Sequence, residues 1–352
     1  MAIAGTTSNA TPRLSQGTVI GYGVRLIPGR NRLRIARTAI AITLLTTLAA
    51  ACFSSSSTGS VRGGSLARGV SLQGARFTVG SKEFTEQLIL CHITSLALRS
   101  AGATVREKCG LQGSKLTRAA LTSGSIDMYW EYTGTAWILH LHHTEPIRDP
   151  AQQYESVTQE DLAKNHIKWL MPSPANDSYA IGVNTDKAKV LGVNSISDYA
   201  RLVGTNPSAA SMCVASEFAG RSDGLPGLEK AYGFTVPKGG LATIAEGAIY
   251  DAIHKGDPCN FGETTTTDGR IQALGLTVLQ DDKQFFPVYN PALTVRESVY
   301  QDHPDLAKIA DPIATALTNE EFQRLNGDVD VKGKDPKQVA RDWLLAKGFI
   351  SS

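Results

Sequence analysis

Residues 127–135 read Asp-Met-Tyr-Trp-Glu-Tyr-Thr-Gly-Thr, which brings three aromatic rings, two carboxylates and two threonine hydroxyls into nine positions. The segment before them, roughly residues 116–125, has the pattern of a helix that ends at Gly124, because glycine commonly follows the last helical turn. The sequence therefore predicts a short strand at 127–135 that enters a Thr-Gly turn.

Alternate side chains of such a strand point to opposite faces of a sheet. Trp130 and Tyr132 then share one face, and Tyr129 and Glu131 share the other. One set can enter a hydrophobic core while the other lines a cleft. The simpler alternative is a core strand that happens to be rich in aromatic residues, and the segments that follow bear on the choice.

The elements around this strand alternate between strand and helix. A strand is predicted at 76–79, a helix at 85–100 and a second strand at 104–107, followed by the helix before Gly124. This alternation is typical of a parallel α/β sheet. Ligands of such sheets bind beyond the carboxyl ends of the strands, where Lys82 and the Thr-Gly turn are expected.

A second set of alternating elements is inserted into the first. Its predicted helices and strands, with the helices that end the chain, cover 180–183, 196–203, 211–215, 244–254, 259–262, 311–317, 319–325 and 336–345. The sequence therefore predicts a first lobe at 76–180 plus 289–352 and a second lobe at 181–288. Two strand-like crossings near 179–182 and 286–290 would form a hinge, with a cleft between the lobes.

The charge of the chain is unevenly distributed. A chain of 352 residues has room for two lobes of ordinary size, and its formal charge is +2. Residues 1–51 contain six arginines and no lysine, aspartate or glutamate, which leaves 29 basic and 33 acidic side chains in the remainder. A mildly acidic remainder gives no sign of the basic surface that nucleic-acid binding requires.

The first 51 residues have the pattern of a secretory signal. Arginines at 30, 32, 34 and 37 precede an uncharged apolar run at 38–51 that is too short to span a bilayer. The run leads into Cys52 and resembles a bacterial lipoprotein cleavage box, in which Cys52 would carry the lipid. Cys52 could instead be an ordinary cysteine beside a soluble-secretion site. Residues 52–75 are rich in Ser and Gly and are expected to form a flexible tether.

Four further cysteines favour disulfide bonds in an exported chain: Cys91, Cys109, Cys213 and Cys259. Three pairings are possible. Cys91–Cys109 with Cys213–Cys259 is the preferred one, because each bond then stays within one predicted lobe and leaves the lobes free to move. No spacing among these cysteines is that of a zinc knuckle.

Seven short motifs occur in order along the chain. They are Gly-Ser-Lys-x-Phe-Thr-Glu at 80–86, Glu-Tyr-Thr-Gly-Thr at 131–135, Asp-Ser-Tyr-Ala at 177–180, Arg-Ser-Asp-Gly-Leu at 221–225, Tyr-Asp-Ala-Ile at 250–253, Thr-Asp-Gly-Arg at 267–270 and Asp-Asp-Lys-x-Phe-Phe-Pro at 281–287. With this set, the chain from about Phe77 to its end resembles the substrate-binding proteins of osmoprotectant ABC importers, the group for glycine betaine, choline, carnitine and proline betaine. The resemblance implies a two-lobed periplasmic-binding-protein (Venus flytrap) fold, with no cofactor and no catalysis.

The resemblance also implies ligands that carry a quaternary ammonium group. Such a group has no conventional hydrogen bond to donate, so aromatic faces must recognise its charge. The aromatic cage of the family falls on Tyr132, Tyr179 and Tyr250, with Asp177 nearby. The clamp for a ligand carboxylate falls on Lys82 and Arg221, with Thr135 assisting. Changing Tyr179 or Arg221 to Ala is predicted to weaken binding at least tenfold and to leave the melting temperature without ligand nearly unchanged.

One position departs from the family pattern. Thr265 stands where the family often has a fourth tyrosine. The cage then lacks one wall, and a larger or flatter ligand, such as carnitine or an aromatic compound, could enter. The importer role implied by the resemblance does not depend on this position.

Two other classes of function have less support in the sequence. His140, His142 and His143 could bind a transition metal, but the segment is loop-like and lacks a third spaced ligand, which favours solvated surface histidines. The chain has no Gly-x-Ser-x-Gly elbow, no His-Glu-x-x-His motif and no dinucleotide-binding glycine pattern, so nothing in it favours an enzyme. The prediction is a lipid-anchored monomer on the outer face of the cell membrane, which delivers its ligand to an ABC permease and its ATPase.

Overall fold

The computed structural model of the chain describes residues 62–351. The predicted signal region at 1–51, Cys52 and the first part of the predicted tether lie outside these residues. Within 62–351, every helix is too short or too polar to cross a membrane.

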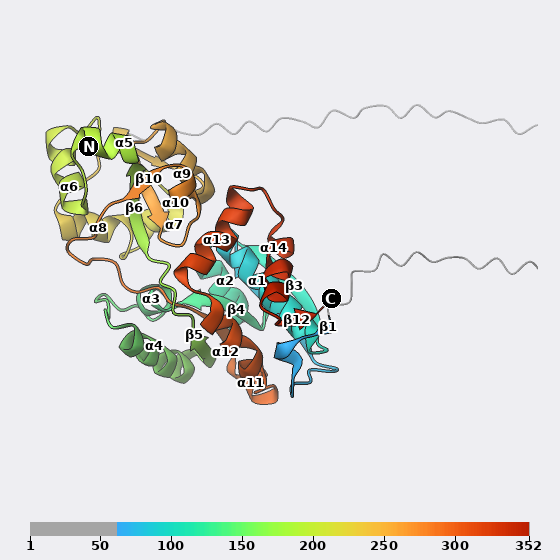
Figure 1. Cartoon of the computed structure of the whole chain (residues 1–352). Helices are drawn as coiled ribbons and strands as arrows, with labels where there is room; N and C mark the ends of the chain where they lie inside the picture. Colours follow the sequence, from blue (N-terminus) through green and yellow to red (C-terminus); the bar gives the residue numbers. More distant parts are fainter. Residues whose placement is uncertain (1–61, 352) are drawn as a thin grey trace, which may run out of the picture. The chain divides into compact units, whose positions relative to one another are not determined.

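Five strands in the order β3-β2-β4-β11-β5 form the sheet of the first lobe. Figure 1 labels β3, β4 and β5 of this sheet. Their bounds are β2 Arg76–Lys82, β3 Thr104–Leu111, β4 Met128–Tyr132, β5 Ile167–Pro172 and β11 Pro291–Arg296. β2 pairs in parallel with β3 and β4, as the sequence predicts, whereas β11 is antiparallel to both β4 and β5. The predicted parallel part of the sheet is therefore confirmed. β11 adds antiparallel pairs that the sequence does not predict, because the chain returns from the second lobe in the opposite direction and inserts β11 beside β4.

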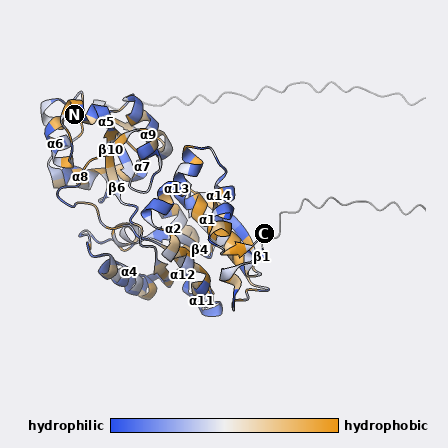
Figure 2. Ribbon diagram, in the orientation of Figure 1, coloured by the Kyte–Doolittle hydropathy of each residue, from blue (hydrophilic) through white to orange (hydrophobic). Residues whose placement is uncertain are grey.

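Helices cover both faces of this sheet. Their bounds are α1 Thr85–Ser100, α2 Gly113–Thr122, α3 Thr133–Thr135, the π-helical turn η2 Ala136–His140, α4 Pro150–Asn165, α11 Glu297–Asp302, α12 Leu306–Ala316, α13 Asn319–Asp330 and α14 Pro336–Ala346. α1 is apolar along much of its length whereas α4 is mainly polar, and α1 packs against β2, β3, α13 and α14. Figure 2 shows this contrast between the apolar α1 and the hydrophilic α4.

Both faces of β4 are buried. Trp130 lies in the core cluster that contains the α1 side chains, and its indole N–H donates to Thr94 of α1 at 2.8 Å. Tyr129 lies in a separate cluster with Trp169 and Leu121. The predicted division of this strand into two faces is therefore confirmed, and each face packs a different layer of helices.

A second five-stranded sheet, in the order β10-β6-β9-β7-β8, forms the second lobe. Its strands are β6 Tyr179–Asn184, β7 Met212–Val214, β8 Leu241–Thr243, β9 Phe261–Thr265 and β10 Leu276–Val278. Its helices are α5 Thr185–Leu191, α6 Ile196–Thr205, α7 Ser216–Gly220, α8 Leu225–Tyr232, the 3-10 turn η3 Lys238–Gly240, α9 Glu246–Lys255 and α10 Arg270–Ala273. One apolar cluster fills the face under α6 and α8, and another fills the face under α9.

Two segments join the lobes, at 173–178 and 279–290. The second agrees with the predicted crossing near 286–290. The first lies a few residues before the predicted one, because residues 179–182 already pair with β9 inside the second sheet. The lobe limits at 180/181 and 288/289 stay a prediction.

The part of the predicted tether that the structure describes is packed against the first lobe. β1 (Arg62–Gly63) pairs antiparallel with β12 (Ile350–Ser351), and the turn η1 (Ser65–Ala67) follows. Leu66, Val70 and Leu72 are buried in the core of the first lobe. Residues 62–75 therefore belong to the fold, since these three side chains anchor a segment that otherwise has a flexible composition.

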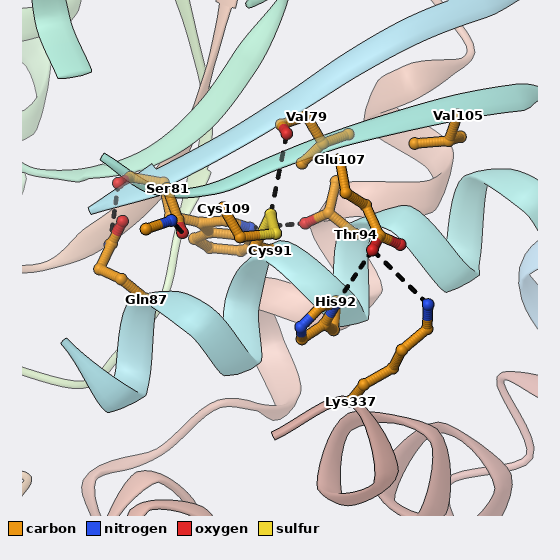
Figure 3. The surroundings of a disulfide bond; sticks show 12 residues. Val79, Ser81, Gln87, Cys91, His92, Thr94, Val105, Glu107, Cys109 and Lys337 are labelled. Carbon is orange, nitrogen blue, oxygen red and sulfur yellow. Dashed lines mark hydrogen bonds and ion pairs between the residues drawn. A yellow bond between two sulfur atoms is a disulfide. The ribbon is translucent and has the colours of Figure 1, made fainter. Parts of the chain in front are cut away.

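Both preferred disulfides are present, Cys91–Cys109 in the first lobe and Cys213–Cys259 in the second. Figure 3 shows the first bond, which links α1 to β3. Beside it, Glu107 interacts with His92 and with Lys337 of α14. Each bond stays within one lobe, so neither restrains the movement of one lobe against the other.

Removing either disulfide is expected to destabilise the chain by an amount that follows the length of the loop it closes. The sequence separations are 18 residues for Cys91–Cys109 and 46 for Cys213–Cys259. Loop-closure entropy then gives losses of about 3 and about 4 kcal/mol. Urea unfolding of the two Cys→Ala pairs, measured against the wild type under oxidising conditions, checks both values. A pair that unfolds at the wild-type urea concentration contradicts the estimate for its bond.

Candidate functional site

A cavity of about 570 Å³ is lined by residues of both lobes. Seven of the eight predicted ligand-binding residues line it: Lys82, Tyr132, Thr135, Asp177, Tyr179, Arg221 and Thr265. Lys82 ends β2, Tyr132 ends β4 and Thr265 ends β9. The cavity therefore lies at the carboxyl ends of strands, where ligands of α/β sheets bind.

Tyr250, the eighth predicted residue, does not line the cavity. Its ring lies under the guanidinium of Arg270, with 4.0 Å from Arg270 Cζ to the ring centroid. Its hydroxyl accepts the backbone N–H of Thr265 at 3.0 Å. Tyr250 therefore supports the lining from behind, because its place on α9 turns the ring toward the sheet and Arg270 covers it.

Lys82 connects the cavity to a buried polar network around Glu131. Its ammonium lies 2.6 Å from Glu131 Oε1, and Tyr129 and His140 lie 2.7 and 2.9 Å from Oε2. Burial disfavours ionisation of Glu131, but Lys82 and His140 outweigh it and hold the pKa of this carboxyl below its usual value. Burial lowers the pKa of His140. This network fixes the position of the Lys82 ammonium, which lies 4.9 Å from the centroid of the Tyr132 ring.

The Tyr132 ring is held by its hydroxyl. The hydroxyl donates to Glu86 Oε1 at 2.8 Å, and the Gln87 side chain donates to it at 3.2 Å. Burial, together with the nearby Asp177 carboxyl, raises the pKa of Glu86 well above its usual value. The Thr267 hydroxyl lies 2.7 Å from Glu86 and 2.6 Å from Asp177. Glu86 and Thr267 come from different lobes, so this chain of hydrogen bonds crosses between them next to the cavity.

Tyr179 belongs to an aromatic wall that the sequence revealed only in part. Its ring packs edge-on against Phe218 at 5.0 Å and against Tyr289 at 5.4 Å between centroids. The guanidinium carbon of Arg221 lies 5.4 Å from the Tyr179 centroid. Tyr289 and Phe84 also line the cavity. Phe84 lies inside the 80–86 motif and Tyr289 two residues after the 281–287 motif, so both could have been predicted from their neighbourhood.

Arg221 is buried, and each of its three guanidinium nitrogens donates a hydrogen bond. It donates Nε and Nη2 to the two carboxylate oxygens of Asp223 at 2.7 and 2.5 Å, and Nη1 to Glu217 at 2.8 Å. Nη2 also reaches the Thr135 hydroxyl, across the lobes, at 3.4 Å. Asp223 in turn accepts the Tyr289 hydroxyl at 2.8 Å. The predicted clamp residue is therefore held in a fixed orientation by carboxylates of its own chain.

Acidic side chains outnumber basic ones in the lining, six against three. The acidic residues are Glu83, Asp177, Glu217, Glu246, Glu263 and Asp330, and the basic ones are Lys82, Arg221 and Arg270. An excess of carboxylates around a cavity favours a ligand that carries positive charge. The sequence patterns did not identify Glu217, Glu246 or Glu263 as lining residues, since the first two resemble ordinary acidic residues at helix starts.

Burial shifts the ionisation of these carboxyl groups. Burial and neighbouring carboxylates, chiefly Asp177, raise the pKa of Glu246 to about 8. Burial raises the pKa of Asp177 to about 6. Burial and the charge of Glu246 also raise the pKa of Glu263 well above its usual value. Near neutral pH some of these carboxyl groups are therefore protonated, and the binding of a cation would release protons from them.

We expect the affinity for choline, a cation without a carboxylate, to rise as the pH rises from 5.5 to 7.5. Asp177 loses most of its proton over this range and Glu246 begins to lose its own toward the upper end, and each loss leaves a negative charge beside the ligand. The expected gain is at least about threefold, since a single charge in a partly buried site is worth about 1 kcal/mol or more. Calorimetry in two buffers of different ionisation enthalpy measures both the affinity and the protons released.

The matched control for this experiment is Glu246→Gln, which should reduce the protons released at pH 7.5. Asp177 and Glu246 have the opposite effect on the free energy of unfolding, which falls as the pH rises. Their folded pKa values lie above the unfolded ones, so the stability they contribute at low pH is lost as the pH rises from about 4 toward 8. A choline affinity that falls over this pH range would contradict the assignment.

The three histidines weighed as a metal site do not converge on one point. His140 lies against Glu131, whereas His143 lies 2.8 Å from Glu160 and stacks on Trp137. Within 62–351, three potential metal ligands converge only at His92, Glu107 and Cys109. The Cys109 sulfur is part of a disulfide and is not free to bind a metal. The described residues give the metal-binding alternative no support.

Comparison with known proteins assigns the chain to a group. Residues 75–346 match the family model of the substrate binding domain of ABC-type glycine betaine transport systems. The chain is 39% identical over 277 residues to a glycine-betaine-binding protein of Pseudomonas aeruginosa, which covers 77% of this chain and 88% of that protein. It is 30% identical to an ergothioneine transport permease/ergothioneine binding protein of Helicobacter pylori, over 77% of this chain and 47% of that protein. The solved structure of apo YehZ from Escherichia coli has a TM-score of 0.59 and 33% identity, over 78% of this chain and 100% of that one.

Proposed function

Because this chain belongs to the family of substrate-binding domains of ABC-type glycine betaine transport systems, we propose that it captures a quaternary-ammonium solute in the cavity between its lobes. The ligand would be glycine betaine, choline, carnitine or proline betaine. The observation that carries the proposal is the lining itself, which combines aromatic rings with an excess of carboxylates. A permease with its ATPase would receive the ligand, as the family assignment implies.

The trimethylammonium group would lie against the rings of Tyr132 and Tyr179. Both rings are held by other contacts, Tyr132 through Glu86 and Tyr179 through Phe218 and Tyr289. Rigid rings lose little freedom on binding, so more of the cation–π attraction remains as affinity. Asp177, which also lines the cavity, would add a negative charge near the ligand.

A ligand carboxylate would be held by Lys82 from the first lobe and Arg221 from the second, with the Thr135 hydroxyl assisting. All three line the cavity. Neither lobe alone carries both charges, so binding would favour the form in which the lobes meet. Hydrogen bonds that already join the lobes near the cavity, from Ser114 to Glu217 and from Arg221 to Thr135, support this coupling.

The protein would act outside the cytoplasm, held to the outer face of the membrane by a lipid on Cys52. The signal pattern of residues 1–51 supports this part of the proposal. Globomycin treatment or Cys52→Ala, followed by fractionation, tests the anchor separately from ligand binding. Release of the Cys52→Ala protein from the membrane fraction supports the lipid anchor, and unchanged membrane retention argues against it.

A second ligand class is favoured by the wall at Thr265. Thr265 lines the cavity, where a side chain smaller than tyrosine would leave more space for a ligand, and the Helicobacter pylori relative named above is an ergothioneine-binding protein. A flat, zwitterionic aromatic compound that carries a trimethylammonium group would use the same rings and the same clamp. The importer role is common to both ligand classes.

The test is calorimetric titration of the purified chain with glycine betaine, choline, carnitine, proline betaine and ergothioneine. Micromolar affinity for at least one of them, about −8 kcal/mol, is expected from two cation–π contacts together with the charged groups. Thr265→Tyr serves as a matched variant, because it should favour the smaller osmolytes over ergothioneine. Absence of binding for all five compounds would contradict the proposal.

A further inference from the structure

Glu217, the second residue of α7, places its carboxylate on donors from both lobes. The backbone N–H of Ser114 donates to Glu217 Oε2 at 2.9 Å, and the Ser114 hydroxyl donates to Oε1 at 2.6 Å. Arg221 Nη1 donates to the same Oε1 at 2.8 Å. Burial opposes the ionisation of Glu217, but Lys82 and Arg221 outweigh it and lower the pKa of this carboxyl.

These donors form the kind of site that binds a small carboxylate. Ser114 lies in the first turn of α2, a ten-residue helix whose free N–H groups attract anions. The site adds a hydroxyl, a guanidinium and a nearby ammonium. Two of these groups, Arg221 and Lys82, are the ones proposed above for the acid group of the ligand. The Glu217 carboxylate therefore occupies the hydrogen-bond donors that a ligand carboxylate would use.

The contacts of Arg221 show which of its two carboxylate partners a ligand carboxylate could replace. Two of its nitrogens face Asp223, whose side chain is 4% exposed, and the third faces Glu217, whose side chain is 31% exposed. The Asp223 contact is bidentate and is further held by Tyr289. Glu217 is therefore the partner that a ligand can displace at lower cost.

We propose that Glu217 competes with the carboxylate of the ligand for Arg221 and Ser114, and thereby sets the selectivity between zwitterions and cations that lack a carboxylate. The inference rests on the proposed function. A ligand such as glycine betaine must displace Glu217 before its acid group can reach the donors. Choline has no such group, so it leaves Glu217 in place and gains from its negative charge.

A simpler role must be separated from this one. Ser114 and Glu217 come from different lobes, so their contact also stabilises the form in which the lobes meet. Loss of that contact alone would lower the affinity for every ligand by the same factor. The ratio of the affinities for glycine betaine and choline cancels this common factor, and it isolates the competition.

The experiment is titration of wild type and Glu217→Gln with glycine betaine and with choline at one pH and ionic strength. Glutamine keeps the size of the side chain, and its carbonyl still accepts from Ser114, but it carries no charge for Arg221. The ratio of betaine affinity to choline affinity should rise at least tenfold. Glu83→Gln is the matched control, because Glu83 also lines the cavity and accepts the backbone N–H of the adjacent Gly113 at 2.8 Å.

In Glu83→Gln the two affinities should move together, with the ratio changing by less than threefold. Glu217→Asp is the second variant. It keeps the charge on a shorter side chain, and it should raise the ratio by a smaller factor even if Glu217→Gln folds poorly. An unchanged ratio in both Glu217 variants, or an equal rise in Glu83→Gln, overturns the inference while ligand binding itself stands. Failure of the wild type to bind either compound overturns it together with the proposed function.

Discussion

Tyr179→Leu is expected to weaken the binding of choline and of glycine betaine by at least about tenfold. The Tyr179 ring lines the cavity, and a desolvated cation–π contact is worth about 2 kcal/mol, whereas each tenfold in affinity corresponds to about 1.4 kcal/mol. Leucine is chosen because Tyr179 also packs against Phe218, Phe286 and Tyr289. An aliphatic side chain retains much of that packing but offers no ring face to the cation.

Alanine at this position would confuse two effects. Removing the whole ring takes away its contacts with its aromatic neighbours, and since Tyr179 is half-buried the cost is part of the about 3 to 5 kcal/mol of a fully buried aromatic residue. The prediction from sequence, that stability without ligand would hardly change, is therefore not expected to hold for Tyr179→Ala. Calorimetric titration of Tyr179→Leu, with thermal unfolding in the absence of ligand, separates affinity from stability.

Tyr300→Leu is a matched control for this experiment. Tyr300 also has a cation near its ring, Lys168 Nζ at 5.6 Å from the centroid, close to the 5.4 Å between Arg221 and Tyr179. Tyr300 does not line the cavity. Its replacement should leave both affinities within about twofold of the wild type. Equal affinities in Tyr179→Leu and Tyr300→Leu would contradict the aromatic part of the proposed site.

Arg221→Leu is expected to reduce both stability and the binding of ligands that carry a carboxylate. The variant leaves the buried Asp223 without its bidentate partner, and breaking a buried ion pair from one side costs about 3 to 5 kcal/mol. The structure thus changes the prediction from sequence that the melting temperature would stay the same. Glycine betaine should lose at least tenfold in affinity, because it loses one of its two proposed charged donors.

Two controls make this result specific. Arg201→Leu removes an arginine from an exposed pair with Asp198 and should change the free energy of unfolding by less than about 1 kcal/mol. The double variant Arg221→Leu/Asp223→Asn removes the stranded charge and should recover much of the stability without restoring betaine affinity. Urea unfolding and titration of all three variants give both quantities. A double variant that recovers betaine binding would rule out a direct role for Arg221.

Local pattern predicted the first lobe well up to β4. The helix predicted at 85–100 has the bounds of α1, because its apolar side chains recur at helical spacing and Gly102 follows it. β5 and β11 were not predicted. β11 lies between β4 and β5, and this position depends on how the chain returns from the second lobe. The local sequence pattern of residues 291–296 does not specify which strands β11 pairs with. The tether was mistaken for a flexible segment along 62–75, since three apolar side chains suffice to anchor it.

The site could be predicted as far as the motifs extend. The structure brings seven predicted residues to one cavity, whereas it places Tyr250 behind Arg270. Helical periodicity predicts that Tyr250 lies on a buried face of α9, but it does not say whether that face borders the cavity or the sheet. The acidic lining was missed because Glu217 and Glu246 lie at helix starts, where carboxylates are common for a purely local reason.

The pairing of β1 with β12 has a mechanical consequence. The chain enters the described fold at Arg62 and leaves it at Ser351, and these two residues are partners in one short ribbon on the first lobe. A pull applied from the side of residues 1–61 therefore acts directly on that lobe, because both ends of the described segment 62–351 lie there. If Cys52 holds the protein to a membrane, the second lobe can move on its two connecting segments while the attached first lobe stays in place.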